Sequence, residues 1–425
     1  MAGTLWPMLV RRVGLVTLLV GLVSLSGCGA DPQEHGKVIR VPADAPTVAD
    51  GVKRAKPGDT VEIAAGTYHE NVHVAVAGIT VRGVDRNTVV FDGQDKLPNG
   101  LTIEADGVAV ENLTLHGYTQ NGLLFNGAHE PGGSTGAAKI YGTGSDVLDG
   151  YRASYVTSYN NGLYGIYAFA ARNGLIEHSY VSGSPDSGLY IGQCQPCNVV
   201  VRDVTAEHNA IGYYGTNASG GVYVISSVFR SNRLGITPNS QKMEKLAPQI
   251  ETVVAGNLVV DNSDPDTPAI AGGLFGGGIA IGGGTRNTVI RNRVEGNPYA
   301  GVFLVALNEF LPRDNRVEAN VVGGNGIDLL YDSGSADILG NCFVGNTFAT
   351  SLPADIEQAM ACGQTSTRLS AVTKPPVLPA PPGVDYRKIP APAPQPSMPA
   401  AGPSASGAGA VPPAVDLAAI PVPNR

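Results

Sequence analysis

The stretch Asn257-Leu-Val-Val-Asp-Asn262 recurs along this sequence and carries its clearest structural signal. It places two polar anchors five positions apart, with strand-forming residues between them. Three further full copies are Asn292-Arg-Val-Glu-Gly-Asn297, Asn320-Val-Val-Gly-Gly-Asn325 and Asn341-Cys-Phe-Val-Gly-Asn346, and weaker copies begin at Asn112, Ser154, Ser179, Asp203 and Ser227. Most successive anchors are 21 to 35 residues apart, so the middle of the chain is a repeat.

A second pattern, a glycine followed by apolar residues in alternation, has a similar period. Its copies begin at Gly122, Gly165, Gly188, Gly212, Gly235, Gly278, Gly301 and Gly326. Five of the seven intervals are 23 to 25 residues long, and the other two are 43 residues long. Each long interval holds a loop, which we place at residues 127–150 and 263–277.

Both patterns predict short strands separated by turns, because segments this short with alternating apolar residues do not match helices. Strands that recur without a helix-length segment between them cannot form βαβ units of an open parallel sheet. They can stack coil on coil, so that apolar side chains are buried between turns. Repeated Asn side chains then bond to backbone groups at the corners. The sequence therefore predicts a parallel β-helix.

The N-terminal part of this repeat region resembles a known family. The segment KPGDTVEIAAGTYHENVHV at residues 56–74 is similar to the opening of pectin-lyase-like right-handed β-helix proteins, in which a short helix caps the solenoid. Residues 45–55 have the matching helical periodicity. The resemblance implies an all-β, single-stranded, right-handed parallel β-helix with an N-terminal helical cap. This scaffold hosts lyases, hydrolases, esterases, epimerases and non-enzymes, so it does not fix the activity.

Composition and charge exclude several protein classes. The 425 residues include 56 Gly and only 15% charged residues, which argues against a coiled coil and against a charge-driven disordered chain. The net charge of -8, with no basic run, argues against nucleic acid, because phosphate binding needs a concentrated basic surface. We therefore expect no nucleic-acid partner.

The N-terminus predicts export and a lipid anchor. Residues 1–27 combine Arg11 and Arg12 with an apolar run from Val13 to Val23, which is too short to span a bilayer and is typical of a signal peptide. Leu25-Ser-Gly-Cys28 resembles the lipobox of bacterial lipoproteins. The resemblance implies cleavage before Cys28, acylation of its thiol and attachment to the outer face of the bacterial cytoplasmic membrane. The alternative is an ordinary secreted protein.

The remaining chain divides into three parts. We expect a tether at residues 28–37, the β-helix at residues 38–365 and a Pro/Ala-rich disordered tail at residues 366–425. Fifteen of the 31 prolines lie in the 55 residues from Ala371 onward, which show no periodicity.

Four cysteines lie beyond Cys28, an even number in an exported chain. We predict two local disulfides, one between Cys194 and Cys197 and one between Cys342 and Cys362. A redox pair or a metal site is the alternative at Cys194 and Cys197. No helical pattern follows this pair, and no other Cys or His pair completes a ligand set by its spacing.

The second residue after each repeat glycine is expected to face outward. This column reads Leu124, Tyr167, Tyr190, Tyr214, Thr237, Ala280, Phe303 and Asp328. Three consecutive coils thus present Tyr167, Tyr190 and Tyr214 in one file, which is our candidate carbohydrate-binding surface. The alternative is a self-stacked aromatic ladder.

The candidate catalytic residues are His178, Arg202 and Asp203, which stand at corresponding corners of adjacent coils with Glu177 and Tyr180 nearby. A base, an arginine and carboxylates on one face suit proton abstraction beside a sugar carboxylate. The alternative is a surface ion cluster. The catalytic strings typical of polygalacturonases and alginate epimerases are absent. The pair His129-Glu130, in the first long loop, also has catalytic residue types but is more typical of a polar loop.

No cofactor or metal is expected, with calcium as the one alternative. Three acidic residues of the second long loop would be its ligands, although they are more typical of turns: Asp261, Asp264 and Asp266.

Together these features predict a monomeric, lipid-anchored protein outside the cytoplasmic membrane that binds a polysaccharide of the cell wall or surroundings. Whether it also modifies this ligand stays open; an enzyme on this scaffold would be a polysaccharide lyase, epimerase or hydrolase. Two alternatives remain. The repeats also resemble NosD-type copper accessory proteins, although His and Met do not cluster here. A structural or adhesive envelope protein is the other.

Overall fold

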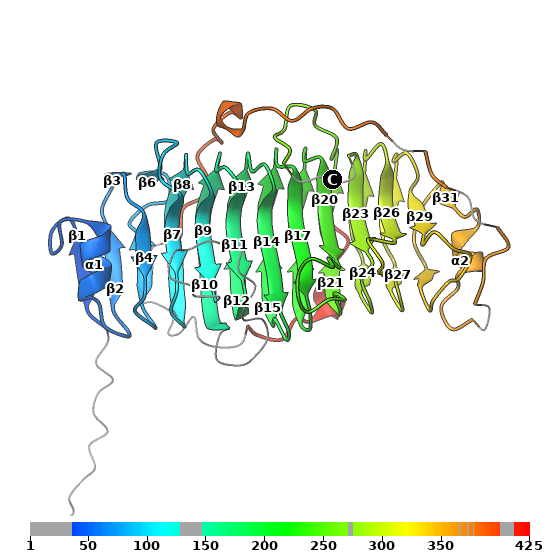
Figure 1. Ribbon diagram of the computed structural model, residues 1–425, viewed down its shortest axis with the longest axis horizontal. Coiled ribbons are helices and arrows are strands. Elements are labelled where there is room, and N and C mark those ends of the chain that lie inside the picture. Colours follow the sequence, from blue (N-terminus) through cyan, green and yellow to red (C-terminus); the bar gives the residue numbers. More distant parts are fainter. Residues whose placement is uncertain are drawn as a thin grey trace, which may run out of the picture. The chain divides into compact units, whose positions relative to one another are not determined.

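The computed structural model describes residues 36–127, 147–270, 275–364, 367–371, 374–376, 378–399 and 412–425. In this part of the chain the strands stack as successive coils, and every pairing between named strands is parallel (Figure 1). The strands form a 20-stranded and an 11-stranded sheet among the described residues. The predicted all-β fold, a right-handed parallel β-helix, is confirmed.

The 20-stranded sheet has two arms that share the long strands β8 (Val108–His116) and β10 (Leu148–Tyr159). The other strands of the first arm are β1 (Val38–Val41), β2 (Thr60–Ile63), β5 (Thr80–Gly83), β12 (Ala171–Glu177), β15 (Val199–Arg202), β18 (Val222–Ile225), β21 (Thr252–Ala255), β24 (Thr288–Ile290), β27 (Arg316–Glu318) and β30 (Cys342–Val344). The other strands of the second arm are β3 (Gly66–Tyr68), β6 (Val89–Asp92), β13 (Tyr180–Ser182), β16 (Thr205–Glu207), β19 (Val228–Arg230), β22 (Leu258–Val260), β25 (Arg293–Glu295) and β28 (Val321–Gly323).

The 11-stranded sheet faces the viewer in Figure 1, and seven of the eight repeat glycines are the second residue of one of its strands. The eighth, Gly326, lies just before a strand. The strands of this sheet are β4 (Val72–Val74), β7 (Asn99–Ile103), β9 (Asn121–Asn126), β11 (Tyr164–Phe169), β14 (Ser187–Cys194), β17 (Ile211–Ala218), β20 (Leu234–Asn239), β23 (Gly277–Gly282), β26 (Ala300–Val305), β29 (Leu329–Asp332) and β31 (Ser351–Leu352).

The core lies inside the coils, where side chains of equivalent positions pack on each other. Ile166, Leu189, Tyr213 and Ile236 pair in register on four successive coils, and each is fully buried. Burying one large apolar side chain contributes about 1.5–3 kcal/mol relative to exposure. Because each coil offers such positions to the coils on both sides, the repeat itself builds the core.

Three ladders of buried Asn side chains join the coils at their corners. In each step, one side-chain oxygen accepts hydrogen bonds from the backbone and side-chain amides of the Asn one coil earlier. Asn257 thus donates to Asn292 Oδ1 at 2.9 and 3.0 Å. The ladders are Asn209–Asn232–Asn262–Asn297–Asn325, Asn257–Asn292–Asn320–Asn346 and Asn287–Asn315–Asn341. The predicted role of the repeated Asn is confirmed.

The last repeat is out of phase with the prediction. Asn341 does not continue the ladder of Asn320; it accepts from Asn315 Nδ2 at 2.8 Å, whereas Asn320 Nδ2 donates to Asn346 Oδ1 at 2.9 Å. A sequence separation of 26 joins Asn320 to Asn346 and makes a full coil. Asn341 follows Asn320 by only 21 residues, so it lies one corner before the position that completes the coil.

The predicted cap is helix α1 (Val48–Arg54), whose N-cap Thr47 accepts a hydrogen bond from Asp50 N. A short helix, α2 (Ile356–Ala359), follows the last coil. Both predicted disulfides are present, with Cα–Cα distances of 4.8 Å for Cys194–Cys197 and 4.9 Å for Cys342–Cys362. Within the described ranges, no helix has the length and apolarity needed to cross a bilayer. The predicted signal peptide and Cys28 lie outside the described residues.

The predicted disorder of the tail is wrong for residues 378–399 and 412–425, which we call the C-terminal segment. It returns along the stack and lies against it (Figure 1, orange and red). Ile389 O accepts a hydrogen bond from Asn160 at 2.7 Å, and Pro396 O accepts one from the buried Arg86 at 3.1 Å. Ile420 packs in a cluster with Val200, Ile225 and Ala255. An extended proline-rich chain leaves its carbonyls free to accept such bonds.

Candidate functional site

The outer face of the 11-stranded sheet carries columns of side chains that run from coil to coil. The register pairs Leu124 with Tyr167, Tyr190, Tyr214 and Thr237 in succession. The predicted outward column is therefore confirmed up to Thr237, and Ala280 pairs with Phe303 further along. Its last predicted member is wrong, because Leu330 pairs with Phe303. Asp328 is instead buried and ends an Asn ladder by accepting from Asn325.

Tyr167, Tyr190 and Tyr214, the tyrosine file, pack edge to face. The ring centroids of Tyr167 and Tyr190 are 4.9 Å apart at 79°, and those of Tyr190 and Tyr214 are 5.5 Å apart at 82°. Tyr167 is only 4% exposed and Tyr190 only 3%. These two rings therefore form the self-packed ladder that was the alternative interpretation, and they offer no open stacking surface. Tyr214 is half-buried and keeps one side accessible.

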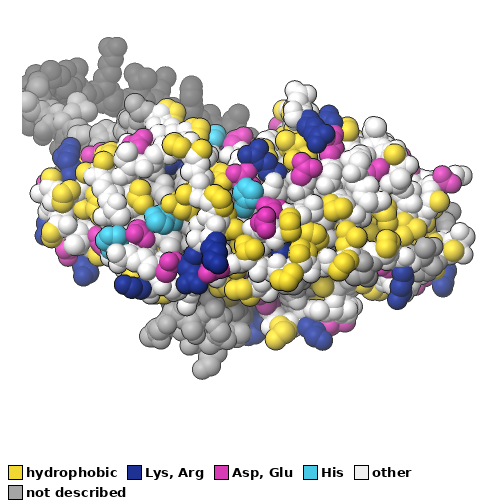
Figure 2. Space-filling view, turned by 90° about the horizontal axis from the view of Figure 1, so that it is seen from above, with side chains coloured by type: hydrophobic (Ala, Val, Ile, Leu, Met, Phe, Trp, Pro, Cys, Tyr) yellow, Lys and Arg dark blue, Asp and Glu magenta, His cyan; other side chains and the backbone are white. Residues whose placement is uncertain are grey.

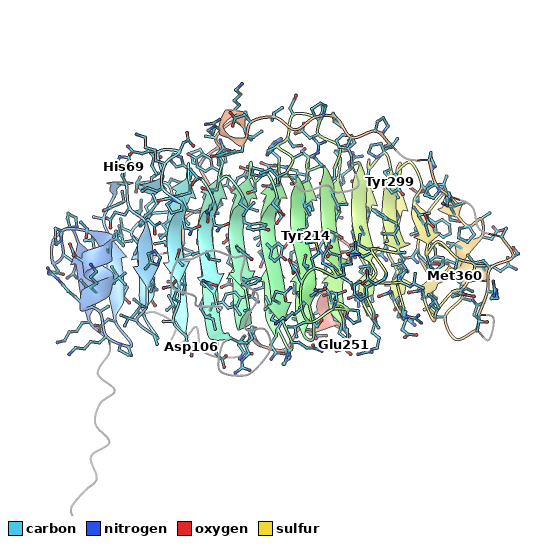
Figure 3. All side chains as sticks on the ribbon, in the orientation of Figure 1. His69, Asp106, Tyr214, Glu251, Tyr299 and Met360 are labelled. Carbon is cyan, nitrogen blue, oxygen red and sulfur yellow. A yellow bond between two sulfur atoms is a disulfide. The ribbon has the colours of Figure 1, made fainter. Side chains whose placement is uncertain are left out.

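A pocket of about 460 Å³, its open mouth included, begins at Tyr214 and extends over the next coils. We call it the sheet pocket. Figure 3 places Tyr214 near the middle of the stack, on the sheet that faces the viewer. Strand residues form its floor, and Gln241 and Leu307 come from loops; the lining is Ile211, Tyr214, Leu234, Thr237, Asn239, Gln241, Ala280, Gly282, Val305 and Leu307. An apolar floor with a few polar groups at its edge is typical of a ligand site.

Two carboxyl groups, Asp186 and Glu244, lie beside this end of the tyrosine file; we call them the acid pair. Glu244 belongs to the loop at residues 240–251, between β20 and β21, and accepts hydrogen bonds from the Tyr190 hydroxyl at 3.1 Å and from the Gln193 amide. Asp186 precedes β14 and accepts a hydrogen bond from the Tyr164 hydroxyl. Both carboxyls are thus held by neutral donors.

Burial dominates the electrostatics of the acid pair. Burial is the main cause that raises the pKa of Asp186 to about 7. The hydrogen bond from Tyr164 acts to lower this pKa, and the charge on Glu244 acts to raise it. Burial also raises the pKa of Glu244, and the hydrogen bonds from Gln193 and Tyr190 oppose it only in part. A carboxyl group that titrates near neutral pH can act as a proton donor or acceptor there.

The pocket and the acid pair meet at Tyr214. Its hydroxyl accepts a hydrogen bond from Gln241 at 3.2 Å, and the charges of Asp186 and Glu244 both act on it. The arrangement therefore combines an accessible pocket and one accessible aromatic ring on the sheet with two protonatable groups that lie beside them.

His178, Arg202 and Asp203 do not assemble into a catalytic site. Arg202 makes two hydrogen bonds to the buried Glu177, the shorter 2.6 Å long, so its guanidinium is engaged in an ion pair. His178 Nδ1 lies 4.0 Å from Asp203 Oδ2, and its ring packs on Tyr155 at 4.7 Å. His178 and Asp203 both have positive φ at equivalent corners of adjacent coils, so they serve the turn.

Glu177 is the centre of a ladder of ion pairs on the outer face of the first arm. Arg152 and Arg202 each approach one of its oxygens at 2.6 Å, and Ser154 donates a third bond at 2.9 Å. Although burial alone would raise it, the pKa of Glu177 is held below its ordinary value by these hydrogen bonds and charges. Glu111 and Arg82 continue the ladder with a 2.6 Å pair. This is the ion cluster that was the alternative interpretation of His178 and Arg202, although its glutamate is buried.

The acidic residues of the second long loop also act in turns. Asp264 Oδ1 accepts from Asp266 N at 2.9 Å, and its Oδ2 lies 2.8 Å from His208 Nδ1. Over the part of the chain that the structure describes, no three His, Cys, Asp or Glu side chains are grouped as metal ligands would be. The pair His129-Glu130 lies outside the described residues.

Sequence reasoning missed Asp186, Gln193, Gln241 and Glu244. One signal pointed to Gln241 and Glu244: the anchors Ser227 and Asn257 are 30 residues apart, about six more than a regular coil. The extra residues form the 240–251 loop.

Elsewhere on the surface, positively and negatively charged side chains are intermixed. Figure 2 shows Lys and Arg beside Asp and Glu on the upper side of the stack.

Comparisons with known proteins agree with this architecture. Residues 150–358 match the model of a family described as periplasmic copper-binding protein (NosD). No curated protein has significant sequence similarity to the chain.

Solved structures share the fold. The A-module of mannuronan C-5 epimerase AlgE6 from Azotobacter vinelandii is 16% identical, with a TM-score of 0.50 over 71% of this chain and 82% of that one. An alginate lyase from Paenibacillus sp. is 17% identical, with a TM-score of 0.38 over 70% of this chain and 98% of that one. At 16% identity the likeness to the AlgE6 module concerns the fold alone.

Proposed function

We propose that this chain, a parallel β-helix protein of the pectin-lyase-like superfamily, binds a polysaccharide on the outer face of its 11-stranded sheet. The observation that carries the proposal is the sheet pocket next to Tyr214. It follows the stacking direction over four strands, β17, β20, β23 and β26. Since strands repeat every 4.7–4.9 Å along a stack, such a surface presents regularly spaced contacts to a regular polymer.

The acid pair extends this proposal to chemistry. A carboxyl group with its pKa near 7, such as Asp186, can move a proton to or from a bound sugar at neutral pH. Lyase, epimerase and hydrolase reactions all need such a group. Binding is the primary function that we propose, and modification of the bound glycan is its extension.

The location that we propose is the outer face of the cytoplasmic membrane, with the chain held by a lipid on Cys28. Its support is the lipobox-like Leu25-Ser-Gly-Cys28, the two disulfides and the match to a family described as periplasmic. Metabolic labelling with a palmitate analogue should tag the wild-type chain and leave Cys28→Ser unlabelled. A chain that reaches the same membrane fraction without label contradicts the lipid anchor.

Copper handling is the second candidate function, and the family-model match over residues 150–358 is what favours it. Elemental analysis of the chain purified from copper-supplemented cells tests it. About one copper per chain that resists dialysis supports this function, and copper at the level of the buffer removes it.

Binding is tested by affinity electrophoresis in gels that contain one polysaccharide each, drawn from neutral, amino-sugar and uronic-acid polymers. We expect at least one of them to retard the wild-type chain. Tyr214→Ala should lose most of this retardation, because it removes the one accessible ring of the tyrosine file. Tyr155→Ala is the matched control, since Tyr155 stacks on His178 at a corner away from the sheet pocket. Equal retardation of all three proteins argues against the sheet pocket.

A further inference from the structure

We infer that the sheet pocket and the acid pair recognise an ammonium group, so that the ligand is a glycan with unsubstituted amino sugars. This inference rests on the proposed glycan binding and adds the chemical class of the ligand. Three features of the site carry it: the hydrogen-bonding type of its unpartnered atoms, the burial of its carboxyls and the character of their neighbours.

Three side-chain oxygens in or beside the site have no hydrogen-bond partner among the described residues. Asn239 lines the sheet pocket and is 1% exposed, yet its Oδ1 has no hydrogen-bond partner among the described residues. The same holds for Gln193 Oε1 in β14 and for Asp186 Oδ1 directly before that strand, two coils earlier. Buried polar groups are normally satisfied, so these oxygens call for a donor that the described chain does not supply.

The acid pair adds negative charge beside Tyr214, at one end of the sheet pocket. Glu244 accepts from Tyr190 and Gln193, and Asp186 accepts from Tyr164, all of which are uncharged donors. In the described ranges neither carboxyl has an arginine or lysine within ion-pair distance, whereas Glu177 on the first arm has two. A half-buried carboxylate without a counter-charge is unfavourable, and a bound cation would remove that cost.

The oxygens require hydrogen-bond donors and the carboxyls require a positive charge, and one kind of sugar substituent provides both. An ammonium group offers three donors, no acceptor and a positive charge, so it meets both the unpartnered oxygens and the carboxyls. A hydroxyl group donates once and brings no charge. A uronate carboxylate only accepts, and the acid pair would repel it. Chitosan-type oligosaccharides, which carry free amines, should therefore bind more tightly than their N-acetylated or uronic-acid counterparts.

Isothermal titration calorimetry of the purified full-length chain tests this with three hexasaccharides: glucosamine, N-acetylglucosamine and mannuronate hexamers. We expect the glucosamine hexamer to bind at least tenfold more tightly than the other two. Asp186→Asn and Glu244→Gln should each reduce its affinity toward that of the N-acetylated hexamer, with the latter's binding little changed.

The chain is acidic overall, so a control must separate site binding from general attraction of a cationic sugar. Glu251→Gln removes one negative charge from an exposed side chain that pairs with Arg286, and it should keep the full preference. If Glu251→Gln weakens binding as much as Asp186→Asn and Glu244→Gln do, the attraction is general and the inference fails.

The outcomes also separate the inference from the proposed function. Equal affinity for the amine and N-acetylated hexamers, or tighter binding of mannuronate, overturns the ammonium site and leaves polysaccharide binding in place. If no hexamer binds, and no polymer retards the chain in electrophoresis, polysaccharide binding itself fails.

Discussion

Single Asn side chains fix the register of this solenoid. Asn292 accepts two bonds from Asn257 and donates to Asn320 Oδ1 and Val254 O, all inside the stack. Each Asn therefore accepts from amides of the preceding coil and donates its own side-chain amide to oxygens of both neighbouring coils, which strand pairing alone leaves open at the corners.

Asn292→Ala should lower the free energy of unfolding by about 3 kcal/mol or more, because several buried groups lose their partners at about 1–3 kcal/mol each. Urea unfolding followed by circular dichroism measures this. Asn87→Ala is the matched control: Asn87 is exposed and water can replace its bonds to Gln395. Equal loss in the two variants would show that the ladder is not what holds the corners.

Asp186 makes stability depend on pH in a defined direction. Its folded pKa, about 7, lies above the ordinary value near 4. Between these pH values the folded chain keeps a proton on Asp186 that the unfolded chain has lost. The stability that Asp186 contributes below pH 4 is therefore lost as the pH rises through 7. The fall in melting temperature from pH 5 to pH 8 should therefore be smaller in Asp186→Asn than in wild type.

Glu251→Gln, which replaces an exposed carboxyl group, should show the same fall in melting temperature from pH 5 to pH 8 as the wild type. A fall of the same size in Asp186→Asn would mean that Asp186 is ionised at pH 5 in the folded protein.

The sequence predicted residues at corners and on strand faces far better than residues at the site. Tyr167, Tyr190 and Tyr214 align as expected because strand alternation determines which side chains face outward. Their exposure could not be predicted, since it depends on how loops lie over the sheet. Asp186 and Glu244 are 58 residues apart and meet only because the 240–251 loop returns over β14 and β17.

At the scale of elements, the charged residues on the outer face of the first arm have a structural role and not a catalytic one. Glu177 lies between Arg152 and Arg202, so its ladder links β10, β12 and β15. A short pattern of His, Arg and Asp at a repeat corner is equally typical of an active site and of a turn. Only the contacts of Glu177 distinguish these interpretations.

Glu177→Gln should lower the free energy of unfolding by about 3 kcal/mol, because it leaves two arginines beside a partly buried site without their counter-charge. Urea unfolding measures the loss, and the glycan affinity of the folded fraction should be unchanged. A variant as stable as wild type that no longer binds or converts the glycan would restore this corner as the functional site.

The repeated strands predicted the coils, but no periodicity revealed the C-terminal segment. Its contacts come from backbone carbonyls of a proline-rich chain and from single apolar anchors such as Ile389 and Ile420. Neither kind of contact leaves a sequence pattern, which is why the composition suggested disorder.

At the scale of the whole molecule, the C-terminal segment acts as a strap that joins distant coils. Ile420→Ser should lower the melting temperature by a few degrees, because it removes an apolar side chain from the cluster of Val200, Ile225 and Ala255. Ala419→Ser, at an exposed neighbouring position, should have little effect. Identical melting curves for both variants would mean that the segment adds no stability.

The central claim is that a glycan binds on the outer face of the 11-stranded sheet. Hydrogen–deuterium exchange with and without a bound oligosaccharide tests it most directly, because it maps protection along the whole chain. We expect slower exchange in the 240–251 loop and around Leu307, which border the sheet pocket. Protection at the corner of His178 and Arg202 instead, or an unchanged 240–251 loop in a saturated complex, would contradict it.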